Sequence, residues 1–159
     1  MRTKIQTKIR TETRVDTAEM LYSALNNLID ASQSMKTNFI DQLIYIPWLR
    51  DFCTIKLQAA RRTGHDSCIQ MFIEDHPNKK FLIIHPMLAQ MNYFKENLNS
   101  SNCYLASAQN TDSCRGLADI DYVIVNNASF IKKENLDKIY NFAEPYAANN
   151  RDFLIILIG

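Results

Sequence analysis

From residue 54 onward the sequence alternates short apolar runs with amphipathic stretches, and this alternation limits the possible folds more than any other feature. The continuous apolar runs, such as FLIIH and FLIILI, predict strands that are buried on both faces. Strands are expected at 54–60, 79–86, 103–109, 121–127 and 151–159, and helices at 66–76, 87–99 and 132–150. We therefore expect an α/β fold with a mainly parallel sheet and helices on both of its faces.

The residues before this alternating region are predicted to add helices to the core. Asp16 and Glu19 form a capping-box pattern, and apolar residues follow them at helical spacing. A second helix is expected at 39–53, bent or interrupted at Pro47. The stretch before Asp16 carries five basic side chains against one acidic side chain, and we interpret it as an edge strand or a solvated arm.

Length and charge restrict the domain organisation and the class of protein. A chain of 159 residues suits one compact domain, in which residues 1–53 form an arm and helices packed on a core of residues 54–159. The net charge of +1 argues against a strongly basic nucleic-acid coat protein. No apolar run is long enough to span a bilayer, and the N-terminus lacks a secretory apolar core. These features predict a cytoplasmic protein without a membrane partner.

Cysteine usage predicts no metal site. The four cysteines show no CxxC spacing, and the three histidines are scattered. We expect free and mostly buried thiols at Cys53, Cys68, Cys103 and Cys114.

Two polar stretches follow the carboxyl ends of predicted strands. Ala59–Ser67 has the layout of a phosphate-binding loop, with a strand before it and a helix after it. Its Arg61, Arg62 and His65 lie near a predicted helix N-terminus, where backbone N–H groups favour anions. The second stretch is Asn126–Ser129. Ligands of parallel sheets bind at the carboxyl ends of the strands, so we expect the two stretches to converge there.

Three segments resemble the ATPase core of phage large terminases and related helicase-like ATPases. LQAARRTGHDS resembles their Walker A segment, and KKFLIIHPMLAQMNYFKENL resembles the strand and helix that follow it. SCRGLADIDYVIVNNASFI resembles their Walker B region. The resemblance covers roughly residues 50–159 and implies a reduced core of the P-loop NTPase type.

The chain departs from this pattern at the positions of the Walker A segment that carry chemistry. Gly64 occupies the second glycine position, His65 the Lys position and Asp66 the Ser/Thr position, while Ser67 follows one residue late. The loop lysine supplies a permanent cation to the phosphates, whereas histidine is mostly neutral at pH 7. Asp66 also places a negative charge where the phosphates would lie.

The Walker B region departs in the same way. Asn126 occupies the position of the Mg²⁺-holding Asp, and Asn127 that of the Glu that activates water. A neutral amide holds Mg²⁺ poorly and cannot act as a base. Losing one such group commonly costs about a thousandfold in rate. We therefore predict a catalytically inactive pseudo-ATPase without catalytic residues, metal or cofactor. The resemblance implies a phage source, and hence a place in the host cytoplasm.

The expected work of such a pseudo-ATPase is protein association, with an active motor or with a second copy of itself. Two alternatives remain open. One is an atypical NTPase that uses His65 and Asp66. The other is a protein that binds nucleic acid through its N-terminal basic residues with Arg61, Arg62 and Arg115, weakly and with a steep salt dependence.

Each motif also has a plain structural explanation. The arginines of the loop can be solvated or can pair with Asp66 and Asp121, Arg115 and Gly116 can form a turn, and the two asparagines can simply end a strand. For the loop itself we expect a collapsed form, too narrow for a nucleoside triphosphate. In that form Asp66 accepts a hydrogen bond from a first-turn N–H group or pairs with the arginines.

Overall fold

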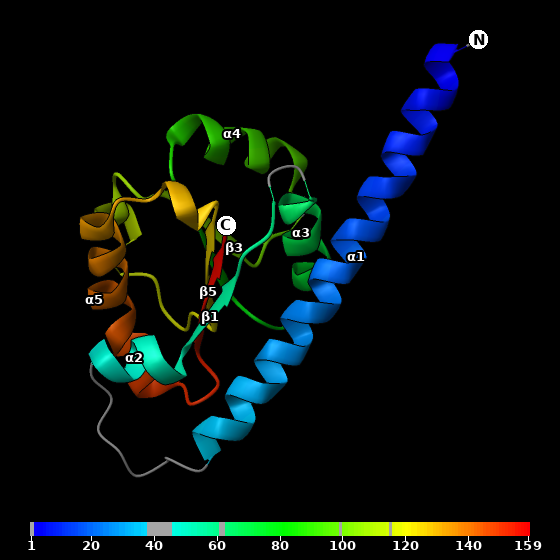
Figure 1. Cartoon of the computed structure of the whole chain (residues 1–159). Coiled ribbons are helices and arrows are strands. Elements are labelled where there is room, and N and C mark those ends of the chain that lie inside the picture. The colour runs from blue at the N-terminus through cyan, green and yellow to red at the C-terminus, as the bar shows by residue number, and fades with distance from the viewer. Residues whose placement is uncertain (1, 38–45, 61–62, 99, 115) are drawn as a thin grey trace.

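The core of the protein is a five-stranded parallel sheet with helices on both faces (Figure 1). The computed structural model describes residues 2–37, 46–60, 63–98, 100–114 and 116–159. The strands are β1 (Thr54–Leu57), β2 (Phe81–His85), β3 (Cys103–Ser107), β4 (Tyr122–Asn126) and β5 (Leu154–Ile158). Their order in the sheet is β1-β5-β4-β2-β3, and every neighbouring pair is parallel. The predicted α/β class is confirmed.

The strands that the sequence shows as continuous apolar runs lie in the middle of the sheet. Every residue of β2, β4 and β5 is buried. Ile124 of β4 is in register with Ile83 of β2 on one side and with Ile156 of β5 on the other. The edge strand β1 has an exposed lysine at its third position, as expected for a strand with one open side.

Two layers of helices cover the sheet. The helices are α1 (Arg2–Thr37), α2 (Ile46–Phe52), α3 (His65–Asp75), α4 (Leu88–Asn97) and α5 (Lys133–Asn149), with short 3₁₀ turns at Thr111–Cys114 and Ala128–Phe130. One apolar cluster joins one face of the sheet to α2 and α5, and a second joins the other face to α1, α3 and α4. Helices on both faces are thereby confirmed, and α5 runs on past Pro145.

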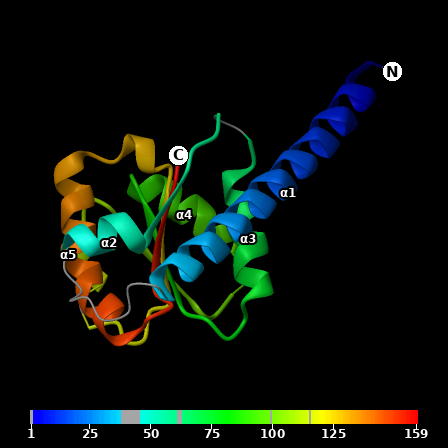
Figure 2. The same cartoon turned by 60° about the horizontal axis from the view of Figure 1, so that its bottom comes forward.

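Helix α1 corrects the expectation for the N-terminal stretch. Its backbone is helical from Arg2, so the prediction of an edge strand is wrong, and Asp16 lies inside the helix instead of capping it. The apolar periodicity after Asp16 requires a helix. Because no Gly or Pro precedes Asp16, this helix continues toward the N-terminus. The amino-terminal part of α1 extends beyond the rest of the molecule (Figures 1 and 2).

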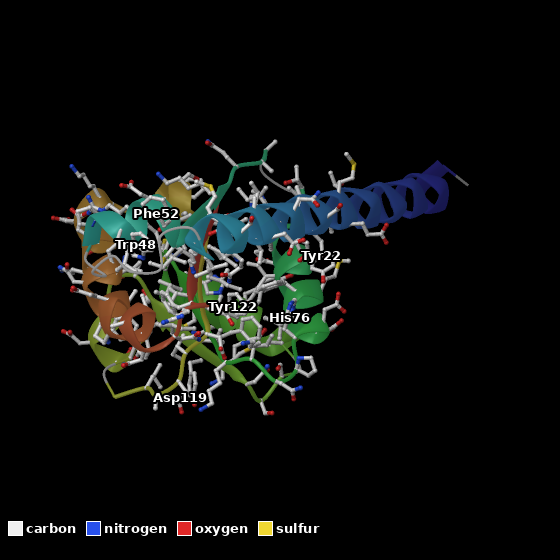
Figure 3. All side chains as sticks on the ribbon, turned by 90° about the horizontal axis from the view of Figure 1, so that it is seen from below. Tyr22, Trp48, Phe52, His76, Asp119 and Tyr122 are labelled. Carbon is white, nitrogen blue, oxygen red and sulfur yellow. The ribbon has the colours of Figure 1, made fainter. Side chains whose placement is uncertain are left out.

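The second half of α1 is fixed to the core by apolar and polar contacts. Leu25 is fully buried against α3. The Tyr22 hydroxyl donates a hydrogen bond to the carboxylate of Asp75 on α3, and Figure 3 shows Tyr22 beside that helix. The Lys36 ammonium is buried and donates to the carbonyl oxygen of Phe153 at 2.5 Å. Burial lowers the pKa of Lys36.

Helix α2 begins one residue before Pro47, so the proline lies in the first turn, where its missing N–H costs little. The rest of the helix expected at 39–53 falls largely on residues 38–45, which lie outside the described residues. Trp48 is buried, and its ring stacks on Phe52 with 4.4 Å between centroids. Trp48 belongs to the apolar cluster on this face of the sheet, and the half-buried Phe52 packs against that cluster.

The remaining sequence expectations concern thiols and membranes. Three of the four cysteines are buried and Cys103 is half-buried, as predicted. Within the described ranges, no helix combines the length and the apolar character that crossing a bilayer requires.

Candidate functional site

The loop between β1 and α3 turns sharply into the helix at Gly64. Gly64 has a φ of 89°, in the left-handed region that favours glycine, and its carbonyl oxygen accepts a hydrogen bond from the N–H of Cys68 at 2.9 Å. His65 is therefore the first residue of α3, and Asp66 and Ser67 lie in its first turn. The predicted site residues Arg61 and Arg62 lie outside the described residues.

The structure brings the two polar stretches together. Asn126 ends β4 and is fully buried, and its Nδ2 donates a hydrogen bond to Asp66 Oδ1 at 2.6 Å. Asn127, which follows it, has a left-handed φ of 53°. Among the described residues, the partner of Asp66 is thus the side chain of Asn126 on β4, and no first-turn N–H group bonds to it as expected. The alternative pairing of Asp66 with Arg61 or Arg62 involves residues outside the described ranges.

Two further polar residues at this edge were missed in the sequence. His85 ends β2 and is in register with Ser107, which ends β3. His85, Ser107 and Asn126 are all buried, and they end three neighbouring strands. All three share one signal in the sequence: each is a polar residue near the carboxyl end of a predicted strand.

The buried imidazole of His85 lies in an apolar setting near one carboxylate. His85 is 1% exposed, and the centroid of its ring lies 5.0 Å from that of the Phe94 ring. Burial lowers the pKa of His85, and the charge of Asp66 opposes this effect. Neither ring nitrogen has a hydrogen-bond partner among the described residues.

The first turn of α3 forms one wall of a pocket. The pocket has a volume of about 420 Å³ and lies between α3 and α4, where Tyr93 and Phe94 form the opposite wall and Asn127 closes one end. A larger pocket of about 840 Å³ lies at the opposite end of the sheet, between the segment Gly116–Asp121 and α5. Gly64, His65, Asp66 and Ser67 of the predicted phosphate loop line the smaller pocket with Asn127, while Asn126 lies buried behind Asp66. The smaller pocket is therefore the candidate functional site.

Gly116 and Asp121 lie away from this pocket. Arg115 is outside the described residues, and Gly116 after it has a left-handed φ of 88°. Asp121 precedes β4 at the amino end of the sheet, where it accepts hydrogen bonds from the Lys80 N–H at 2.9 Å and from Asn150 Nδ2 at 3.1 Å. Asp66 and Asp121, the two carboxylates proposed to pair with the loop arginines, therefore lie at opposite ends of β4.

Stability is expected to fall as the pH falls below about 6.5, because His85 resists protonation only in the folded state. The folded pKa is lowered, so between it and the unfolded value of about 6.5 the unfolded chain binds more protons and stability rises with pH. His85→Leu should flatten this slope in urea titrations between pH 5 and 7.5. Ser107→Ala changes the neighbouring strand end without removing a titrating group and should keep the slope. An unchanged slope in His85→Leu would contradict the lowered pKa of His85 in the folded protein.

Comparison with known proteins identifies no family by sequence. No family profile matches the chain, and no curated protein matches it. Among solved structures, the large terminase ATPase domain of Thermus phage P74-26 superposes with a TM-score of 0.49 at 14% sequence identity, over 74% of this chain. A point mutant of that domain gives the same score at 13% identity. The chain spans 64% of the length of these domains.

Proposed function

We propose that this chain is a terminase- or helicase-like module that has lost nucleoside triphosphate hydrolysis and acts by binding a protein partner. The observation that carries the proposal is the 2.6 Å hydrogen bond from Asn126 to Asp66. In the ATPases that the sequence resembles, the corresponding Asp and Ser/Thr both serve a hydrated Mg²⁺. Here an amide and a carboxylate bond to each other directly, so the space between them is closed to a metal ion.

The charge of the site supports the same proposal. Asp66 lines the pocket, and none of the described residues that line it is a lysine or an arginine. Because a triphosphate is highly anionic, it needs fixed cations at its β- and γ-phosphates. A pocket wall that carries a carboxylate repels it instead.

The proposed partner is an active motor of the related kind or a second copy of this chain, in the cytoplasm of a phage host. Support comes from the start of α4, a helix that forms a wall of the candidate site. Its N-cap Met87 and its first residue Leu88 both expose large apolar side chains. Neighbouring exposed apolar side chains of this size can mark protein contacts. Sedimentation of the purified chain tests self-association, and affinity capture with the motor of the same host tests the other partner.

Purified protein is expected to hydrolyse neither ATP nor GTP above the background rate in the presence of Mg²⁺. The reason is that the cation, hydroxyl, metal-holding and base positions are all replaced, and each loss alone commonly costs about a thousandfold. Phosphate release measured for the wild type and for His65→Ala should therefore be the same. Mg²⁺-dependent turnover that disappears in His65→Ala would instead establish an atypical NTPase.

A further inference from the structure

The edge strand β1 leaves one side of its backbone without a partner strand. Its neighbour in the sheet is β5, and no strand among the described residues lies on its other side. The carbonyl oxygens of Cys53 and Leu57 accept hydrogen bonds from β5 and the residue after it, at 2.7 and 3.1 Å. Because the backbone groups of successive strand residues point to alternate sides, those of Lys56 and Gln58 point away from β5. We call this side of residues 56–58 the open edge.

The open edge is accessible from outside the molecule. Helix α1 covers only the residues before it, where Ser32 Oγ donates a hydrogen bond to the carbonyl oxygen of Phe52 at 2.9 Å. Further along, the side chains of Lys56 and Gln58 are exposed. The strand runs between α1 and α2 (Figure 1). Unpaired N–H and C=O groups of such an edge can pair with an extended segment of another chain.

The side of α1 next to the open edge is apolar. Leu28 precedes Ser32 by four residues and therefore lies on the same side of the helix, toward β1. Leu21 and Ala24 continue this side at spacings of three and four residues. Both are half-buried against the apolar cluster that includes Leu57 of β1, whereas Leu28 is 39% exposed. An added strand with apolar side chains toward α1 would bury this surface.

The other face of the open edge carries a positive charge. Ile55 and Leu57 are buried on the face that α1 covers, so Lys56 between them points to the opposite face, where it is exposed. An added strand alternates in the same way, and an acidic side chain beside Lys56 forms a favourable cross-strand pair. The edge of a second copy fits less well, because antiparallel pairing about Lys56 sets two lysines directly opposite each other.

We infer that the open edge of β1 binds an extended segment of a protein partner in which apolar and acidic residues alternate. The backbone of the segment pairs with Lys56 and Gln58, its apolar side chains contact α1, and its acidic side chains lie beside Lys56. The inference rests on the proposed function, since it assigns a surface and a chemistry to the protein partner.

The test is amide hydrogen exchange of the isotope-labelled full chain, followed by ¹H–¹⁵N NMR with and without a short acetylated peptide amide in which Val and Glu alternate. In the free chain the amides of Lys56 and Gln58 should exchange much faster than those of Ile55 and Leu57, which face β5. With the peptide at about ten times its Kd, exchange at Lys56 and Gln58 should slow about tenfold, because only the free chain exchanges.

Two control peptides separate strand addition from other contacts. The same peptide methylated at every backbone nitrogen keeps the side chains but has no N–H donors, and it should give no protection. A peptide in which Val and Lys alternate should bind more weakly, because its charges repel Lys56. Equal protection by either control, or no protection by the Val–Glu peptide at millimolar concentration, would overturn the inference.

Three variants locate the binding surface. Lys56→Glu should weaken binding of the Val–Glu peptide about fivefold and strengthen that of the Val–Lys peptide, because the cross-strand charge is reversed. Leu28→Ala should weaken Val–Glu binding about tenfold, because it removes apolar area that the added strand buries. Lys95→Glu makes the same charge change at an exposed position of α4 and should leave both affinities unchanged. Equal effects of the two lysine variants would contradict the inference.

The remaining outcomes separate this inference from the proposed function. Protection of Lys56 and Gln58 that rises with protein concentration, without any peptide, would assign the open edge to a second copy and would overturn the acidic segment. Hydrolysis of ATP would overturn the proposed function whatever the peptides show. Absent hydrolysis together with absent peptide protection would overturn the open-edge site alone.

Discussion

Phe72→Ala is expected to lower the free energy of unfolding by about 3–5 kcal/mol, because it removes a fully buried ring and leaves a cavity. Phe72 lies on α3, and its ring packs against Tyr122 of β4 and Phe81 of β2, with centroid distances of 5.1 and 5.8 Å. His76 packs on the same ring at 4.5 Å. Figure 3 shows His76 and Tyr122 close together in this cluster. The measurement is urea-induced unfolding followed by circular dichroism.

The matched control for this substitution is Glu74→Ala, two residues further along α3. Glu74 is exposed, and surface substitutions usually change stability by less than about 0.5 kcal/mol. A loss below about 1 kcal/mol in Phe72→Ala would show that α3 does not pack on the sheet as described.

Leu25→Ala is expected to cost about 2–5 kcal/mol, because Leu25 joins α1 to the core beneath it. Leu25 is fully buried and belongs to the same apolar cluster as Cys68 and Ile69 of α3. Leu28→Ala is the matched control. Leu28 is 39% exposed on the same helix, so its truncation should cost much less. Equal losses in the two variants, measured by urea unfolding, would contradict the packing of α1 on α3.

The elements of the core could be predicted because their sequence patterns are local. Every strand expected after residue 54 is present, and the strands with unbroken apolar runs are the ones buried along their whole length. The order of the strands could not be predicted. Any parallel order satisfies the same apolar pattern, and only the three-dimensional structure shows that β5 lies between β1 and β4.

Part of the candidate site could be predicted from the rule that strand carboxyl ends converge. That rule placed Asp66 near Asn126 before their contact was known. It could not predict that the two side chains bond to each other, because the partner of Asp66 depends on which strand end lies below α3. His85 was missed for a different reason. It belongs to no motif, and only the register of β2 with β3 and β4 reveals that it lies beside the other strand ends.

The helical backbone of the N-terminal stretch was not predicted because its local pattern is ambiguous. Residues 2–14 alternate loosely between basic, Thr and apolar side chains, a pattern compatible with a strand, an arm or a helix. The residues that follow this stretch decide that it is helical. The helix that includes Leu25 packs on α3 and continues toward the N-terminus, where no residue breaks it.

The position of β5 has a consequence for the order of events during synthesis. Residues 54–57 leave the ribosome about a hundred residues before the strand that pairs with them, which is made at 154–158. Until β5 arrives, β1 has no neighbour, and β4 presents an unpaired apolar edge. Contacts between segments so far apart slow folding, and exposed strand edges favour aggregation. The sheet of this chain is therefore open to wrong pairings until β5 enters it.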